Sequence, residues 1–210
     1  MIESTETLTI VLIAVTCITT YLAWNNRDMY FKWIGNPYMI YHRRQFHRLI
    51  SSGFLHADIP HLAFNMITLY FFGPLLERFF TSRYGEVQGG ICFFAFYLLA
   101  LVVSSLPSLV KYRDQPNYNA VGASGAVSAV LFFFVLLAPW ENLYLYFAIP
   151  IPAIVFGALY IGFSYYMAKR NMDNIGHDAH LFGALFGFFV PIIIDPNLAV
   201  YFIDQLLSVL

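Results

Sequence analysis

Charged side chains are scarce in this chain of 210 residues. Lysine, arginine, aspartate and glutamate make up 11% of it, against roughly a quarter in an ordinary soluble domain. So few charges cannot cover the surface of a water-soluble fold of this size. The net charge of −1 gives no electrostatic footprint for nucleic acid, so we expect no nucleic-acid partner. The 19% of aromatic residues exclude disorder, and a membrane protein remains.

Cysteine is rare too. Cys17 and Cys92 are the only two, and each lies inside an apolar run, so we interpret them as small buried hydrophobic residues and expect no disulfide framework. A zinc site of four cysteines is excluded, and the H-E-x-x-H signature of zinc proteases is absent. The histidines, by contrast, cluster near two places in the chain, which is the first hint of chemistry: His42, His47, His56, His61, His177 and His180.

Long stretches without charge predict an all-α polytopic membrane protein. A helix needs about 17–25 residues to cross a bilayer core of about 30 Å, and backbone polar groups in lipid must be satisfied within the segment. We expect six transmembrane helices, at residues 8–24, 58–77, 87–109, 121–138, 143–166 and 179–194. The predicted organisation is a short tail (1–7), a six-helix domain (8–196) with a long first loop (25–57), and a C-terminal tail or surface helix (197–210).

Three groups of polar residues stand in or beside these apolar segments, where such residues usually mark function. His61 and Asn65 are four residues apart, so they share a helix face and can donate hydrogen bonds to one point. Polar contacts between helices are the alternative explanation. Ser124, within Gly122-Ala-Ser-Gly125, stands at a helix start, where free backbone N–H groups can hold an oxyanion. Packing of small residues is the alternative there.

The third group surrounds His180. Gly183 and Gly187 share its helix face, and this Gly-x-x-x-Gly spacing lets a second helix approach closely. A serine nucleophile needs its base within about 2.6–3.2 Å, which requires such closely packed backbones. A role in packing or hydration is the alternative. Asp178, two positions before His180, points about 200° away on a continuous helix, so no third acid is supplied locally.

In their joint order, these motifs resemble the rhomboid intramembrane serine proteases. The shared residues are His61-x-x-x-Asn65, Gly122-Ala123-Ser124-Gly125 and Ala179-His180-x-x-Gly183-x-x-x-Gly187. Gly73 and Glu77, which close the predicted second helix, and Arg48, eight residues before His56, fit the same pattern.

The resemblance implies a compact bundle of six helices and a Ser–His dyad. Ser124 would be the nucleophile that forms an acyl-enzyme, and His180 the general base. His61 and Asn65, with the backbone N–H of Ser124, would form the oxyanion hole. The expected supporting residues are His56, Gly122, Gly125, Gly183 and Gly187. The implied partners are transmembrane protein substrates within the lipid bilayer, and no cofactor or metal is expected.

Two positions depart from the family pattern. His47-Arg48 stands where many relatives carry Trp-Arg, which affects how the first loop is anchored in the interface. Ser128 stands one turn after Ser124, where some relatives place a tyrosine against the catalytic imidazole. Support for His180 must then come from another aromatic side chain, or its orientation is looser.

Charge gives an orientation opposite to that of the family. The loops on the face of the first loop hold nine Lys and Arg residues against two on the other face, which predicts a cytoplasmic first loop. Bacterial members have a cytoplasmic N-terminus and an active site that faces outward. Five of the nine belong to the structured first loop, so we follow the resemblance and expect a bacterial inner-membrane protein.

Two other functions remain open: a catalytically inactive rhomboid-like protein that binds membrane proteins, and a small transporter or channel that uses His56, His61, His177 and His180. Pro150 and Pro152, within the predicted fifth helix, favour a kink. Such a kink can be a packing bend, or it can let the helix tilt to admit a substrate.

Overall fold

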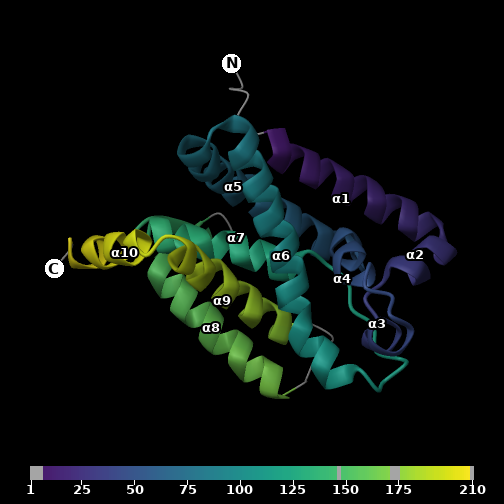
Figure 1. Ribbon diagram of the computed structural model, residues 1–210. Coiled ribbons are helices and arrows are strands. Elements are labelled where there is room, and N and C mark those ends of the chain that lie inside the picture. Colours follow the sequence, from purple (N-terminus) through teal and green to yellow (C-terminus); the bar gives the residue numbers. More distant parts are fainter. Residues whose placement is uncertain (1–6, 146–147, 171–175, 209–210) are drawn as a thin grey trace.

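The computed structural model describes residues 7–145, 148–170 and 176–208, and these are mostly helical (Figure 1). The long helices are α1 (Thr7–Asn25), α5 (Ile59–Tyr84), α6 (Glu86–Tyr112), α7 (Ser124–Leu137), α8 (Ala153–Arg170) and α9 (His177–Ile194). Every predicted helix has a counterpart among them. The starts of all but the fifth lie close to their predicted positions, which confirms the helical fold class.

The long helices differ in how well they suit a bilayer. By length and composition α1, α5, α6 and α9 can cross a membrane. Helix α7 is apolar but has only 14 residues, fewer than the 17 or so that a crossing helix needs. The structure therefore supports a membrane protein, and the count of six crossings stays a prediction.

The predicted fifth helix is wrong before Ala153. Strands β1 (Asn142–Leu145) and β2 (Ile149–Pro152) form an antiparallel pair there. Proline cannot donate to a strand ladder, but it is tolerated in an edge strand. Pro150 and Pro152 therefore lie in β2 and not inside a helix, which removes the expected proline kink. Helix α8 starts directly after them.

Helix α5 runs to Tyr84, beyond its predicted end at residue 77. Glu77 is 2% exposed and accepts hydrogen bonds from the backbone N–H groups of Leu8 and Thr9, both at 2.9 Å, and from the Thr9 hydroxyl at 2.7 Å. A Cβ on Gly73 would also overlap the Thr9 side chain. Gly73 and Glu77 therefore bind α1 to α5 and do not close the helix.

The first loop is structured, as its length predicts. It contains α2 (Arg27–Trp33), α3 (Pro37–Arg43), α4 (Arg48–Ser51) and the 3-10 turn η2 (Ser52–Phe54), and α3 and α4 contact α6. Buried Arg48 donates to the carbonyl oxygens of Phe31 at 2.8 Å and Ile34 at 2.7 Å, and to the Gln45 side chain at 2.7 Å. Arg48 thus anchors the loop, although His47 replaces the tryptophan before it.

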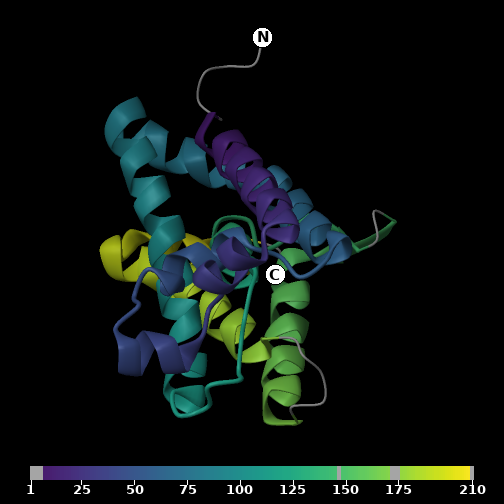
Figure 2. The ribbon, with the colours of Figure 1, turned by 90° about the vertical axis from the view of Figure 1, so that its right-hand side faces the viewer.

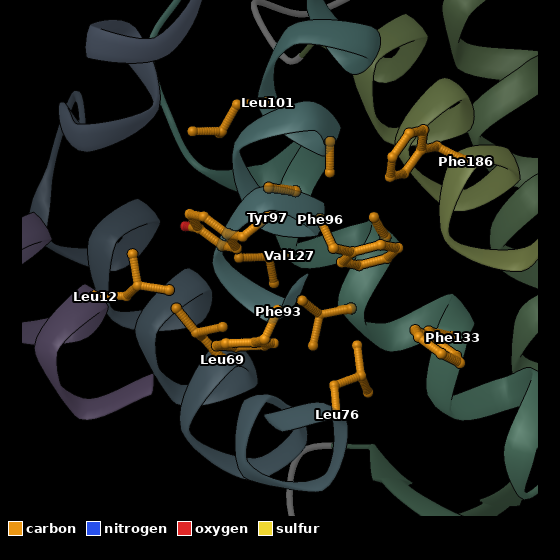
Figure 3. Close-up of a cluster of buried hydrophobic side chains, with 14 of the residues drawn as sticks. Leu12, Leu69, Leu76, Phe93, Phe96, Tyr97, Leu101, Val127, Phe133 and Phe186 are labelled. Atoms are coloured by element: carbon orange, nitrogen blue, oxygen red, sulfur yellow. The ribbon is translucent and has the colours of Figure 1, made fainter. Parts of the chain in front are cut away.

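Helices α6 and α7 form the centre of the bundle. Helix α6 contacts α5, α7 and α9, and α7 contacts α5, α6, α8 and α9. Figure 1 shows α6 running through the middle of the view, and Figure 2 shows the same helices from the side. Figure 3 shows the buried cluster between them, which draws Leu12 from α1, Leu69 from α5, Phe96 from α6 and Phe186 from α9. Eleven of the 14 residues of α7 are buried, so this short helix is enclosed by its neighbours.

The C-terminal segment contains a further helix, α10 (Asn197–Leu207). The indole N–H of Trp140, which follows α7, donates to the carbonyl oxygen of Gln205 at 2.9 Å. Asp195, at the end of α9, forms an ion pair with Arg83 near the end of α5. The last described elements are therefore attached to the same end of the bundle.

Candidate active site

Ser124 is the first residue of α7 and is half-buried. Gly122, two residues earlier, has a φ of 119°, a conformation that residues with a side chain rarely adopt. A Cβ on Gly122 would also overlap the imidazole of His61. Glycine therefore serves both the turn into α7 and the close approach of α5 to the Ser124 turn.

His61 and Asn65 lie one turn apart near the start of α5. The Asp58 side chain caps this helix by accepting a hydrogen bond from the His61 N–H at 2.8 Å. Asn65 is 6% exposed, and its side-chain amide donates to the His61 carbonyl oxygen at 3.0 Å. One amide hydrogen is used in this way, which leaves the second available as a donor.

His56 connects α1 to the start of α7. Its Nδ1 lies 3.2 Å from the Thr20 hydroxyl oxygen, and that hydroxyl donates to the Phe54 carbonyl at 3.1 Å. Its Nε2 accepts from the Ala123 N–H at 3.4 Å. A hydroxyl that already donates must accept from Nδ1–H, so His56 is a neutral imidazole with its proton on Nδ1.

The electrostatics of His56 agree with a neutral imidazole. The side chain is fully buried, and burial, reinforced by the nearby His61, lowers the pKa of His56 to about 4, while Asp58 acts weakly in the opposite direction. A group that stays neutral at physiological pH is suited to hold a backbone amide and not to carry a proton during a reaction.

Three of the four glycines predicted to support the site, Gly125, Gly183 and Gly187, lie where α7 crosses α9. A Cβ on Gly183 would overlap the Gly125 carbonyl oxygen, and one on Gly187 would overlap the Ala129 carbonyl oxygen. A Cβ on Gly125 would lie 3.3 Å from the Ala179 carbonyl oxygen. Ser124 neighbours Gly125 and His180 neighbours Ala179, so the turns that carry these two residues face each other across the two helices.

The imidazole of His180 has aromatic neighbours. The Tyr160 ring, from α8, lies 6.1 Å from it between centroids, with 27° between the planes. The His177 ring, one turn earlier on α9, lies 5.8 Å away at 79°. Sequence reasoning did not find Tyr160. The only sign of it in the sequence is Ser128, which predicts either that another aromatic side chain supports His180 or that His180 is oriented more loosely.

Among the contacts of the described residues, none connects the Asp178 carboxylate to His180 as the acid of a catalytic triad. Its carboxylate lies 3.4 Å from the ammonium group of Lys111 at the end of α6.

Among the residues that the structure describes, no group of three or more histidine, cysteine, aspartate or glutamate side chains could hold a metal ion. Both cysteines are half-buried and unpaired with each other.

Comparisons with known proteins agree with the motifs. The Rhomboid domain family matches residues 43–196. The chain is 35% identical over 145 residues to RHOMBOID-like protein 12, mitochondrial, of Arabidopsis thaliana, a match that covers 66% of this chain and 43% of the relative. It is 32% identical over 139 residues to Rhomboid protease GluP of Bacillus subtilis, covering 66% and 25%. With Rhomboid-related protein 1 of Caenorhabditis elegans the identity is 29% over 167 residues, covering 76% and 43%.

The chain spans less than half the length of these relatives. One of these relatives is named as mitochondrial, and another comes from a bacterium. The comparisons therefore support a membrane protein and do not favour the bacterial inner membrane over an organelle membrane.

Proposed function

This chain belongs to the rhomboid family, and on that premise we propose that it is a serine endopeptidase that cleaves membrane proteins in or near their transmembrane segments. One observation carries the proposal. The turn of α7 that holds Ser124 and the turn of α9 that holds His180 face each other through glycine contacts, with the His61 ring against Gly122 on the α5 side. These close approaches support Ser124 as the proposed nucleophile, His180 as the proposed base and His61 as a proposed hydrogen-bond donor.

In the proposed reaction Ser124 Oγ attacks the carbonyl carbon of the scissile peptide, and its proton passes to the His180 imidazole. His180 then gives that proton to the leaving amine as the C–N bond breaks, which leaves an ester on Ser124. Water hydrolyses the ester, with His180 as the base again, and Ser124 regains its proton.

The negative oxygen of each tetrahedral intermediate needs donors. The backbone N–H of Ser124 belongs to the first turn of α7, where N–H groups have no intrahelical partner. The His61 imidazole lies against Gly122 in the turn before Ser124, and Asn65 follows His61 by one turn of α5; both are the proposed side-chain donors. His56 holds the Ala123 N–H, which fixes the backbone directly before these donors.

Labelling with a fluorophosphonate tests the proposal without a known substrate. We expect wild-type protein in detergent micelles to be labelled, and Ser124→Ala and His180→Ala to lose labelling while they retain the wild-type unfolding midpoint. Ser82→Ala is a matched control, because Ser82 is exposed near the end of α5. A wild-type protein that folds but is not labelled contradicts the proposal and favours the inactive binding protein.

The substrate class needs a second measurement. Membrane-protein fragments from cells that express the wild-type protein are compared with those from cells that express Ser124→Ala. The proposal predicts new fragment ends in or beside transmembrane segments only with the wild type. Equal fragment sets in both cells contradict the assigned substrate class.

A further inference from the structure

The aromatic ring nearest to His180 comes from α8, whereas Ser124 and His180 are on α7 and α9. Tyr160, on α8, places its ring beside the His180 imidazole with centroids 6.1 Å apart and planes 27° from parallel. This is within the range of offset-stacked aromatic pairs. The α7 position one turn after Ser124, Ser128, is too small to reach over an imidazole as a ring would.

Ser128 instead fixes the tyrosine. Its hydroxyl donates to the Ser124 carbonyl oxygen at 2.7 Å and lies 2.6 Å from the Tyr160 hydroxyl. A serine hydroxyl has one hydrogen, and the carbonyl can only accept it, so the Tyr160 hydroxyl is the donor to Ser128. The Tyr160 hydroxyl is thereby connected through Ser128 to the backbone of Ser124.

The ring of Tyr160 also has two phenylalanine neighbours. Phe132 of α7 lies 5.5 Å from it and Phe156 of α8 lies 5.9 Å from it, between centroids. With its phenol oxygen hydrogen-bonded to Ser128 and its ring in contact with two phenylalanines, Tyr160 has a defined orientation as long as α8 stays against α7.

A second ring pair repeats the contact between α8 and α9. Phe163, three residues after Tyr160, lies 5.6 Å from the His177 ring at 81°, and His177 itself lies 5.8 Å from His180. Residues three apart on a helix share a face. Two aromatic rings of α8 thus face two histidines of α9.

We propose that Tyr160 is a positioning residue that holds the His180 imidazole in the plane it needs to accept the Ser124 proton. This inference rests on the proposed function. It also connects the reaction to α8, because a displacement of α8 withdraws the ring from His180. The site is then complete only while α8 is seated against α7.

The test measures the fluorophosphonate labelling rate of tyrosine variants. Tyr160→Leu removes the ring and is expected to lower the labelling rate about tenfold, while Tyr160→Phe keeps the ring, loses the contact with Ser128, and lowers it about threefold. Tyr165→Leu is the matched control, because Tyr165 is on the same helix and is 52% exposed. With a cleaved substrate, the loss should fall on kcat and leave KM unchanged.

Moving the ring to the other helix distinguishes positioning from packing. The double variant Tyr160→Leu/Ser128→Tyr supplies a ring from α7, and we expect it to recover at least half of the lost rate. A Tyr160→Leu rate equal to that of Tyr165→Leu contradicts the proposal, and so does a double variant no faster than Tyr160→Leu.

A readout that does not need activity separates this proposal from the proposed function. A proton above the face of a tyrosine ring has an upfield NMR shift. In Ser124→Ala protein with labelled histidine, the His180 signal, assigned through His180→Gln, should move downfield when Tyr160→Leu is added. An unchanged signal contradicts the stacking, whereas a shifted signal in a protein that is never labelled contradicts only the protease function.

Discussion

Helices α8 and α9 both pack against α7, but at different distances. Gly183 and Gly187 bring the α9 backbone into contact with carbonyl oxygens of α7. On α8, a Cβ at Gly157 would lie 3.5 Å from the Phe132 and Val135 side chains, and one at Gly162 would meet nothing within 4 Å. Helix α9 therefore touches α7 through its backbone, and α8 touches it through side chains.

This difference in packing coincides with a difference in the proposed roles of the helices: α7 and α9 carry the reacting residues, and α8 carries the ring that orients the base. The proposed nucleophile and base sit on α7 and α9, whose backbones cannot shift relative to each other without losing contact. The ring that orients the base sits on α8, which buries three of its 18 residues, Ala153, Gly157 and Ser164. A reacting pair that must stay within hydrogen-bond reach is thus on the closely packed helices, and its support is on the edge helix.

The largest effect is expected from Gly183→Ala, which adds a methyl group where α7 and α9 touch. The Cβ would overlap the Gly125 carbonyl oxygen, and a backbone atom cannot move aside as a side chain can. We expect the free energy of unfolding in mixed micelles to fall by more than about 3 kcal/mol, together with loss of fluorophosphonate labelling.

Gly157→Ala is the control for that variant, because its Cβ would find ordinary contact distances on the α8 side. It should change the free energy of unfolding by less than about 1 kcal/mol. Equal losses in both variants would show that α8 and α9 do not differ in the way described.

The second-largest effect is expected at the start of α7, the helix against which both α8 and α9 pack. Burial lowers the pKa of His56 to about 4, from 6.5, so the unfolded chain takes up a proton at a higher pH than the folded one. The stabilisation from neutral His56 is complete above about pH 6.5 and is lost as the pH falls toward 4. The expected loss of unfolding free energy is about 3 kcal/mol.

Unfolding in mixed micelles at several pH values between 7 and 4 measures this dependence. His56→Gln should be less stable at pH 7 and should show a shallower slope. If His56→Gln and wild type have the same slope, His56 is not the group that holds the start of α7.

The smallest effect is expected at Gly162, on the open side of α8. A Cβ there meets nothing within 4 Å, and alanine is favoured over glycine inside a helix by up to about 1 kcal/mol. Gly162→Ala should therefore leave unfolding unchanged or raise its free energy slightly, with a labelling rate equal to that of wild type. A clear loss of stability would mean that α8 is packed as closely on this side as α9 is on α7.

Sequence reasoning found the helices wherever absence of charge coincided with helix limits. It failed where a feature other than charge determines where a helix begins or ends. Residues 143–152 carry no charge, yet Pro150 and Pro152 fit an edge strand better than a helix, so α8 starts at Ala153. Within α5, the charge of Glu77 predicts a helix end, but hydrogen bonds from α1 to its carboxylate let Glu77 stay inside a longer helix.

The candidate site divides in the same way. Spacing within one helix places His61 beside Asn65 and His180 beside Gly183, because the helical period fixes those relations. Relations between helices depend on packing distance and rotation, which no spacing encodes. An aromatic at His180 could thus be predicted from Ser128 only beside the alternative of a looser orientation, and its identity as Tyr160 required coordinates.

The shortness of α7 has a consequence for depth. Its 14 residues extend about 21 Å at about 1.5 Å per residue, against a hydrocarbon core of about 30 Å. Its neighbours enclose it, so its length does not have to match the thickness of the surrounding lipid. The position of Ser124 relative to the helices that surround α7 is therefore fixed by the protein. A bilayer of different thickness changes how far the outer helices tilt, while the distance between Ser124 and the far end of α7 stays the same.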